Sequence, residues 1–262
     1  MKDNFSDKNI SNQDEEVTSH FIEGRNAVLE AMRSGRTIDK LYMQDGLRDG
    51  ASNTILRDAK KRDVIVSFVS KEKLDLMSKT KKHQGVIAIC AAYEYSDMED
   101  IFKGAEEKNE RPFIFILDEI EDPHNLGAII RTANLCGAHG VIIPKRRAVG
   151  LTATVVKASA GAINYTPVVK VTNIAKTIEE LKGRGMWFAC ADMEGELMYG
   201  CNLTGALGIV IGNEGSGVSR LVNEKCDYVV SIPMKGDIDS LNASGAAGVL
   251  AYEGVRQRML KG

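Results

Sequence analysis

The sequence lacks the features that mark a membrane protein, a disulfide-rich secreted protein or a metalloprotein. No apolar run approaches the roughly 20 residues that span a bilayer. The cysteines are odd in number and form no Cys-x-x-Cys pair, and the histidines are scattered without the spacing of metal ligands. We therefore expect no membrane partner and no metal, with free thiols in a reducing cytoplasm.

A strong charge of one sign is also missing, since the formal net charge is only −2. The first sixteen residues hold more acidic than basic side chains and no apolar core, so we expect a disordered tail over residues 1–18 rather than a secretory signal. Two compact basic clusters stand out against this balance, Lys79–His83 and Lys145–Arg147. Each has the charge to bind phosphates, and the competing interpretation is a solvated surface loop.

Strand and helix patterns alternate along the chain and predict an α/β protein in two domains. Residues 19–96 read as a small α/β domain, with an amphipathic helix over Gly24–Met32 and apolar strands near residues 38–43, 64–69 and 85–92. The charged stretch 97–111 reads as a linker with a short helix. Pro112 then opens a second domain, residues 112–262.

In this second domain, short apolar strands alternate with helical patterns, which favours a parallel sheet covered on both faces. We expect strands at residues 113–120, 140–143, 186–191, 207–211 and 228–232, and helices that include 126–136, 152–160, 173–184, 218–223 and 241–260. No G-x-G-x-x-G sequence follows the first strand, so a nucleotide-binding oxidoreductase is disfavoured.

The most informative stretch is Ile232–Ser244. An apolar strand runs into a glycine-bearing turn, and a Ser-Leu-Asn sequence then opens a helix of small residues. A strand end, a polar turn and a helix N-terminus together make a ligand site in an α/β sheet. A second such turn, Gly212–Gly217, follows the strand at 207–211.

Single residues in these segments have ordinary structural interpretations as well. Asn125 and Ser240 are each suited to cap a helix. Glu214 is suited to a helix N-terminus, where the dipole favours a carboxylate. Arg131, on an otherwise apolar helix, is typical of a surface residue.

Taken together, Asn125–Ala133, Ile209–Gly217 and Ile232–Ser244 resemble, in their order and spacing, the motifs of the SpoU family of RNA 2′-O-methyltransferases, within the SPOUT class. The resemblance covers the chain beyond its first twenty residues. It implies a parallel-sheet SPOUT domain with a C-terminal trefoil knot, preceded by a small L30e-like RNA-binding domain.

The resemblance also implies a site. It places Asn125, Arg131, Glu214, Ser240 and Asn242 in the catalytic pocket and assigns contacts with S-adenosylmethionine to Gly212, Ile232 and Leu241. An arginine pKa above about 12 makes deprotonation difficult, so we favour electrostatic stabilisation of the ribose oxygen and a neighbouring phosphate by Arg131.

The implied reaction is methyl transfer from S-adenosylmethionine to the ribose 2′-hydroxyl of a guanosine in 23S rRNA, by a cytoplasmic homodimer. In that dimer the final helix and the Asn125–Cys136 helix would meet the partner. Two alternatives stay open: a 2′-O-methyltransferase of the same family that acts on tRNA or on rRNA to confer antibiotic resistance, and a non-catalytic RNA-binding assembly factor. The intact catalytic set argues against the second alternative.

Overall fold

The computed structural model describes residues 20–238 and 240–261, so the expected tail over residues 1–18 lies outside the described residues. The chain divides into two compact units. Unit 1 runs up to Glu94 and includes Gly150–Ala153, and unit 2 comprises Tyr95–Val149 and Thr154–Gly262. No helix within the described ranges is long and apolar enough to cross a membrane.

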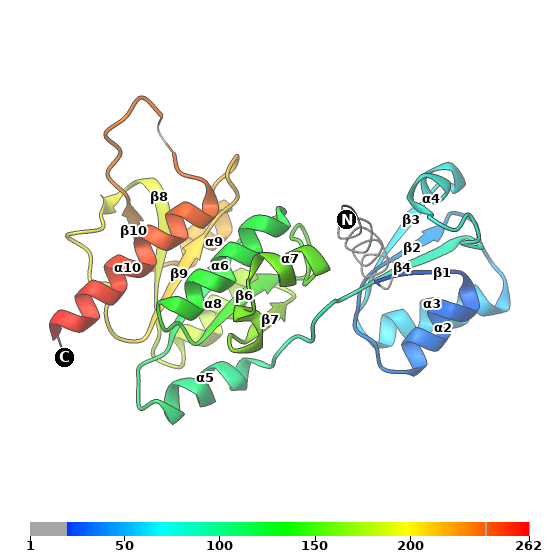
Figure 1. The fold of residues 1–262 in the computed structure, drawn as a ribbon, viewed down its shortest axis with the longest axis horizontal. Coiled ribbons are helices and arrows are strands. Elements are labelled where there is room, and N and C mark those ends of the chain that lie inside the picture. The colour runs from blue at the N-terminus through cyan, green and yellow to red at the C-terminus, as the bar shows by residue number, and fades with distance from the viewer. Residues whose placement is uncertain (1–19, 239, 262) are drawn as a thin grey trace, which may run out of the picture. The chain divides into compact units, whose positions relative to one another are not determined.

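Unit 1 is a four-stranded mixed sheet with helices on both faces (Figure 1). Its strand order is β1–β4–β2–β3, with β2 and β3 parallel and the other pairs antiparallel. The larger core cluster joins one face of the sheet to two helices, and Leu74 of a third helix packs in a separate cluster with Val69 and Ile87. The strands are β1 Phe21–Glu23, β2 Ile38–Gln44, β3 Ile65–Val69 and β4 Val86–Cys90, and the helices are α2 Arg25–Arg33, α3 Gly50–Lys61 and α4 Lys71–Met77.

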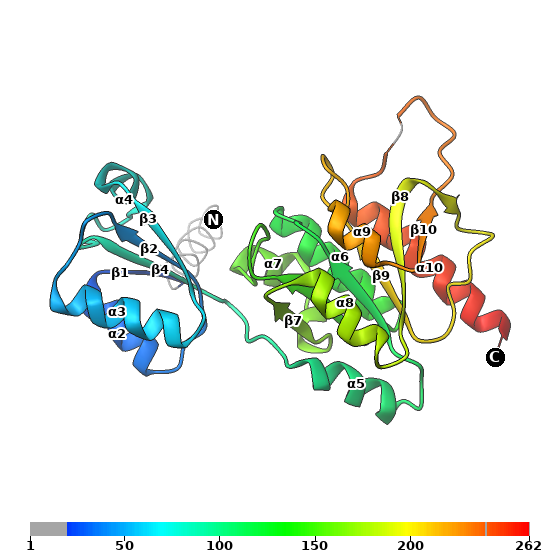
Figure 2. The same cartoon turned by 180° about the vertical axis from the view of Figure 1, so that it is seen from behind.

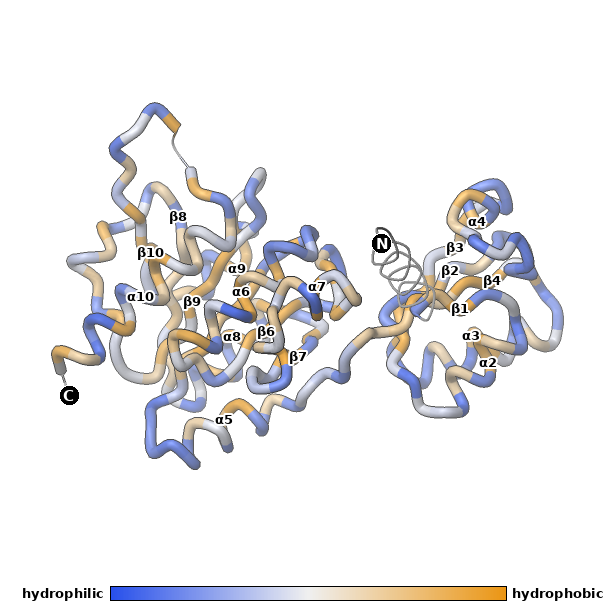
Figure 3. Tube along the Cα trace, in the orientation of Figure 1, coloured by the Kyte–Doolittle hydropathy of each residue, from blue (hydrophilic) through white to orange (hydrophobic). Residues whose placement is uncertain are grey.

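Unit 2 is built on a six-stranded sheet in the order β10–β8–β9–β5–β6–β7, and every pairing in it is parallel. The α/β class with a parallel sheet is therefore confirmed. Every residue of β5, β6 and β9 is buried, and Figure 3 shows apolar residues along β6 and β9. The strands are β5 Phe113–Leu117, β6 Gly140–Pro144, β7 Val168–Val171, β8 Trp187–Leu197, β9 Leu207–Ile211 and β10 Tyr228–Ser231.

Helices cover both faces of this sheet (Figures 1 and 2). Helices α6 and α10 pack against each other, and α8 packs against α9. Short segments α7 and η1 follow β6. The bounds are α6 Pro123–Leu135, α7 Ala153–Ala158, η1 Ala162–Asn164, α8 Ile174–Lys182, α9 Arg220–Lys225 and α10 Ala243–Lys261.

Strand β1 and helix α4 were not expected from the sequence, and three further elements differ in packing or extent. The short helix expected within the linker is α5, Met98–Glu107, but its Ile101 is fully buried in the core of unit 2, so this segment is part of that unit. Strand β8 continues to Leu197, where a register shift in its pairing with β10 between Val229 and Val230 accommodates the longer strand. Helix α10 begins at Ala243 rather than Leu241. The trefoil knot stays a prediction.

Candidate active site

A tightly folded loop, residues 212–217, follows β9 at the carboxyl edge of the sheet. Asn213 and Gly217 exchange backbone hydrogen bonds of 3.1 and 2.8 Å, and the Asn213 side-chain oxygen accepts the Gly215 N–H at 2.8 Å. A β-carbon on Gly212 would lie 2.1 Å from the carbonyl carbon of Gly217. The loop can therefore close on itself only because position 212 is a glycine.

This loop borders a cavity of about 430 Å³ at the ends of the central strands. The end of β8 and the segment that leads into α10 form the other walls. All three predicted cofactor contacts, Gly212, Ile232 and Leu241, line the cavity, and so do Glu214 and Ser240. The remaining lining residues are Ala191, Asp192, Met193, Ile211, Asn213, Gly215, Ser216, Gly217, Val230, Met234, Ala243 and Ala246.

Three predicted catalytic residues form one polar chain. The Asn125 side-chain N–H donates to Oε1 of Glu214, and the Asn242 side-chain N–H donates to Oδ1 of Asn125 at 3.3 Å. These pairs are separated by 89 and 117 residues in sequence. The fold thus brings the helix after β5, the loop after β9 and the start of α10 to one place.

Neither Asn125 nor Ser240 caps a helix. Asp122 is the N-cap of α6 and accepts the His124 N–H at 2.8 Å, so Asn125 lies inside the first turn, where it is 6% exposed. Asn242 accepts the Gly245 N–H at 2.8 Å at the start of α10, which leaves Ser240 outside the helix and on the cavity wall. Burial and hydrogen bonding therefore hold the Asn125 amide in position.

Arg131 is the predicted catalytic residue that belongs neither to the cavity wall nor to the polar chain. It is exposed, it is absent from the cavity wall, and no acceptor among the described residues bonds its guanidinium. Six residues of helix separate it from Asn125, which corresponds to about 9 Å along the axis and a different side of α6. Its neighbours on that side include the 63% exposed Leu135.

Sequence reasoning missed two residues that hold the site loops. Asp118 is 5% exposed, and its carboxylate accepts the Ser219 N–H at 2.8 Å. The Asn213 side chain donates to the backbone oxygen of Glu119 at 3.0 Å. A polar residue directly after the apolar strand Phe113–Leu117 was the available signal for Asp118, because ligand sites form at the carboxyl ends of such strands.

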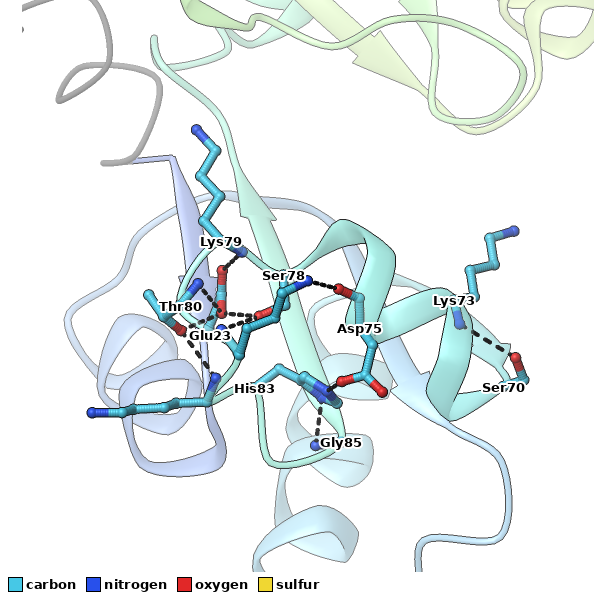
Figure 4. A network of polar contacts seen from close by, with 11 residues as sticks. Glu23, Ser70, Lys73, Asp75, Ser78, Lys79, Thr80, His83 and Gly85 are labelled. Atoms are coloured by element: carbon cyan, nitrogen blue, oxygen red, sulfur yellow. Dashed lines mark hydrogen bonds and ion pairs between the residues drawn. The ribbon is translucent and has the colours of Figure 1, made fainter.

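A second candidate surface lies in unit 1, at the turn that connects α4 and β4 (Figure 4). The carboxylate of Glu23 accepts hydrogen bonds from the Ser78 hydroxyl at 2.6 Å, the Lys79 N–H at 2.8 Å and the Thr80 N–H at 3.4 Å. The Lys79 side chain extends away from this network. Glu23 thereby fixes the backbone that carries the predicted basic cluster.

Burial alone would raise the pKa of Glu23. The hydrogen bonds from Ser78, Thr80 and Lys79 favour the ionised form and outweigh it, so the pKa of Glu23 lies below its ordinary value. His83 is 5% exposed and contacts Asp75 at 2.9 Å, and this bond lowers the pKa of Asp75. The exposed basic side chains of this turn are therefore Lys79, Lys81 and Lys82, without His83, and the Lys81 ammonium also donates to the Asp75 backbone oxygen.

Comparisons with known proteins agree with this arrangement. The sequence model of the SpoU rRNA Methylase family matches residues 112–252, and that for RNA 2′-O ribose methyltransferase substrate binding matches residues 21–96. The "Putative TrmH family tRNA/rRNA methyltransferase YacO" of Bacillus subtilis is 51% identical over 91% of this chain and 96% of its own length. A Staphylococcus aureus protein of the same TrmH family description is 50% identical over 90% of this chain and 96% of its own.

Solved structures give the same result. AviRb of Streptomyces viridochromogenes, a SpoU methyltransferase determined in complex with AdoMet, aligns with a TM-score of 0.57 at 25% identity, covering 92% of this chain and 91% of its own. The A. aeolicus TrmH/SpoU tRNA modifying enzyme aligns with a TM-score of 0.54 at 28% identity, covering 62% and 84%. The family models together match most of the chain, and the curated relatives match it almost end to end. The chain therefore belongs to the SpoU family of RNA methyltransferases, within the SPOUT class.

Proposed function

We propose that this protein uses S-adenosylmethionine to methylate the ribose 2′-hydroxyl of a guanosine in 23S rRNA. The observation that carries the proposal is the polar chain Glu214–Asn125–Asn242, which reaches the cavity at Glu214. It joins the three segments whose order and spacing resemble the family motifs. A degenerate copy that only binds RNA would have no need to keep these three side chains interlinked.

The cavity suits the cofactor. Its volume of about 430 Å³ falls within the roughly 300–1,000 Å³ typical of small-molecule sites. The wall combines apolar side chains, such as Ile232 and Leu241, with the folded backbone of the 212–217 loop, where a side chain at Gly212 would not fit. These residues would hold the adenosine part of the cofactor by apolar and backbone contacts.

When bound, the cofactor supplies an electrophilic methyl group on a sulfonium that leaves as a neutral thioether. The work of the chain is to orient and to stabilise. Asn125 fixes one carboxylate oxygen of Glu214, and the second oxygen can accept a hydrogen bond from the ribose hydroxyl. Ser240 and Asn242 complete the polar edge on which the ribose would lie.

Arg131 would stabilise negative charge on the ribose oxygen and the adjoining phosphate. Because Arg131 is exposed and absent from the cavity wall of its own chain, this role needs a homodimer in which the exposed sides of α6 and α10 meet a second copy. These sides carry large exposed apolar residues: Leu135, Tyr252 and Met259. Such a two-fold interface would repeat the same patch on both subunits.

The dimer is tested at Tyr252, which is exposed on α10; Ala247 of the same helix is fully buried within its own chain, and an arginine there would disrupt the core. Tyr252→Glu should give folded monomers, measured by sedimentation at micromolar concentration. Lys103→Glu, at an exposed position on α5, is the matched control and should remain dimeric. A monomeric and fully active wild-type protein would overturn the proposed dimer.

Unit 1 would capture the RNA. Its match to a substrate-binding family and its preorganised turn with Lys79, Lys81 and Lys82 support this assignment. An rRNA is favoured over tRNA because the family model for unit 2 is described as an rRNA methylase. The tRNA-modifying neighbour also leaves more than a third of this chain uncovered.

The proposal is tested by mapping 2′-O-methyl groups on total rRNA and tRNA from cells with and without the gene. Loss of a single guanosine methylation in 23S rRNA is the expected result, and restoration by the purified protein with S-adenosylmethionine completes it. Loss of a tRNA methylation instead would identify tRNA, not rRNA, as the substrate. An unchanged map, together with no transfer by the purified protein, would overturn the activity.

A further inference from the structure

The second basic cluster, Lys145–Arg147, lies at the same edge of unit 2 as the site but has no part in the function proposed so far. Strands β9, β5 and β6 are parallel neighbours, so their carboxyl ends meet at one edge. The loops that leave these three strands begin at Gly212, Asp118 and Lys145. The basic loop is therefore next to the two loops that shape the active site.

Hydrogen bonds connect the basic loop with the site through one residue, Glu119. The Arg147 guanidinium donates to the Glu119 carboxylate at 3.0 Å, and the Asn213 side chain donates to the Glu119 backbone oxygen at 3.0 Å. The Val149 N–H also donates to the Ile120 oxygen at 2.9 Å. Since Asn213 immediately precedes Glu214, the position of the basic loop is tied to the polar chain of the site.

The loop presents two exposed guanidinium groups that keep N–H groups available to a ligand. Arg146 is exposed, and within the described part of the chain no carboxylate or carbonyl bonds it. Arg147 remains 76% exposed although it pairs with Glu119, so that pair is a solvated one of small net energy and leaves other guanidinium N–H groups free to donate. Neither arginine lines the cavity, so neither is placed to contact the cofactor.

Both residues of this ion pair have an unusual backbone conformation. Glu119 has φ 59° and Arg147 has φ 54°, in the left-handed region that residues other than glycine adopt rarely. Such conformations persist where the surroundings impose them, and they concentrate at functional sites. Here the imposed turns bring the two loops together through the Arg147–Glu119 and Val149–Ile120 contacts.

We propose that Arg146 and Arg147 bind the phosphodiester backbone of the substrate RNA beside the nucleotide that is methylated. This inference rests on the proposed function and gives the catalytic unit its own RNA contact, independent of unit 1. Guanidinium groups match the geometry of phosphate oxygens and bind them with two parallel hydrogen bonds. The contact would carry no sequence information and would set the position of the ribose relative to the polar chain.

The test compares the Arg146→Ala/Arg147→Ala protein with wild type, using rRNA from cells that lack the gene as ligand. Each lost phosphate contact should reduce the slope of log affinity against log salt concentration by roughly 0.7–0.9. We expect a total reduction near 1.5 and a rise in the RNA KM of about tenfold. The affinity for S-adenosylhomocysteine should stay within about twofold. Lys103→Ala, which removes an exposed charge from α5, should leave the slope and the KM unchanged.

Glu119→Gln separates phosphate binding from a purely structural role of Arg147. If the arginine binds RNA, removing the carboxylate charge leaves RNA affinity equal or higher. If the arginine serves only to hold the loop, Glu119→Gln weakens S-adenosylhomocysteine and RNA binding together, as the double variant then would, and the inference fails.

A double variant with the wild-type salt slope and RNA KM would also overturn the inference. Failure of the proposed function looks different, because wild type would then bind rRNA with a measurable salt slope but transfer no methyl group to it. The salt slopes decide the role of the two arginines in either case.

Discussion

Each unit uses a glutamate to organise a functional loop, and the two glutamates do so differently. Glu23 of unit 1 accepts all of its donors from one turn, Ser78, Lys79 and Thr80. Glu214 of unit 2 accepts from Asn125, which in turn accepts from Asn242, so that its chain joins three distant segments. The first arrangement shapes a surface, whereas the second assembles a site.

The two carboxylates differ in the hydrogen-bond acceptor capacity that remains for a ligand. Hydrogen bonds occupy both oxygens of Glu23, so the lysines displayed around it are the groups that can meet RNA. Glu214 is exposed on the cavity wall, and among the described residues Asn125 is its one hydrogen-bond donor. The fold uses both carboxylate oxygens of Glu23 as acceptors, whereas Glu214 keeps one oxygen available to accept a hydrogen bond from a ligand.

The largest effect is expected at Arg131, whose substitution tests whether the catalytic site of unit 2 includes residues outside the polar chain. Arg131→Ala should lower kcat by about a thousandfold, in the range found when a transition-state donor is removed. S-adenosylhomocysteine binding should stay within about tenfold, because Arg131 is absent from the cavity wall. Arg131→Lys should fail as well, since a point charge does not reproduce the guanidinium fork. Near-normal turnover in either variant would confine catalysis to the polar chain.

A smaller effect on cofactor affinity is expected from straining the 212–217 loop, which carries Glu214. Gly212→Ala places a methyl group 2.1 Å from the Gly217 carbonyl carbon, and the strain should cost about 3 kcal/mol and weaken S-adenosylhomocysteine binding roughly a hundredfold. Gly215→Ala is the matched control in the same loop, because its nearest neighbour would be at an ordinary 3.4 Å. Calorimetric titration of both variants measures the contrast. Equal affinities would mean that the loop does not shape the cofactor pocket.

Substitution of Glu23 in unit 1 should weaken RNA binding and leave cofactor binding unchanged. Glu23→Gln replaces an acceptor with a donor that faces the donors of the turn, and one unpaired group costs about 1–3 kcal/mol of stability. RNA affinity should fall roughly tenfold, with cofactor affinity unchanged. Glu30→Gln, on the exposed side of α2, is the control and should leave both affinities unchanged. Weaker cofactor binding in Glu23→Gln would contradict the division of labour between the units.

The smallest effect is a pH dependence. The pKa of Glu23 is lowered from 4.5, so its contribution to stability is fully present above that pH and is lost as the pH falls through the lower, folded-state value. The difference in unfolding free energy between wild type and Glu23→Gln should therefore be constant at neutral pH and shrink in the acidic range below about 4.5. Denaturant titrations at several pH values measure it. A difference that persists unchanged to pH 2 would rule out the charge as its source.

Sequence patterns predicted the strands apart from β1, and most helices, because apolar runs report burial directly. They missed helix α4, and charged residues around Ile101 concealed that the short helix α5 packs into the core. They also ended β8 too early, because its outer half is exposed and has no apolar periodicity. The motifs located Gly212, Glu214 and Asn242, but no local pattern shows that Asn125 bonds both other segments. Two further features depend on tertiary packing and could not be read from the sequence. One is the exposure of Arg131 on α6, and the other is the pair of bonds that Glu119 makes with Arg147 and Asn213.

The polar chain also determines when the protein can become active during its synthesis. Its two bonds span 89 and 117 residues, and Asn242 lies at the start of the last helix. Contacts between such distant residues form slowly, because a large loop entropy is lost before they are made. An emerging chain can fold unit 1 while unit 2 is still incomplete. The RNA-capturing surface would then precede the catalytic site, and the nascent chain would bind substrate before it can modify it.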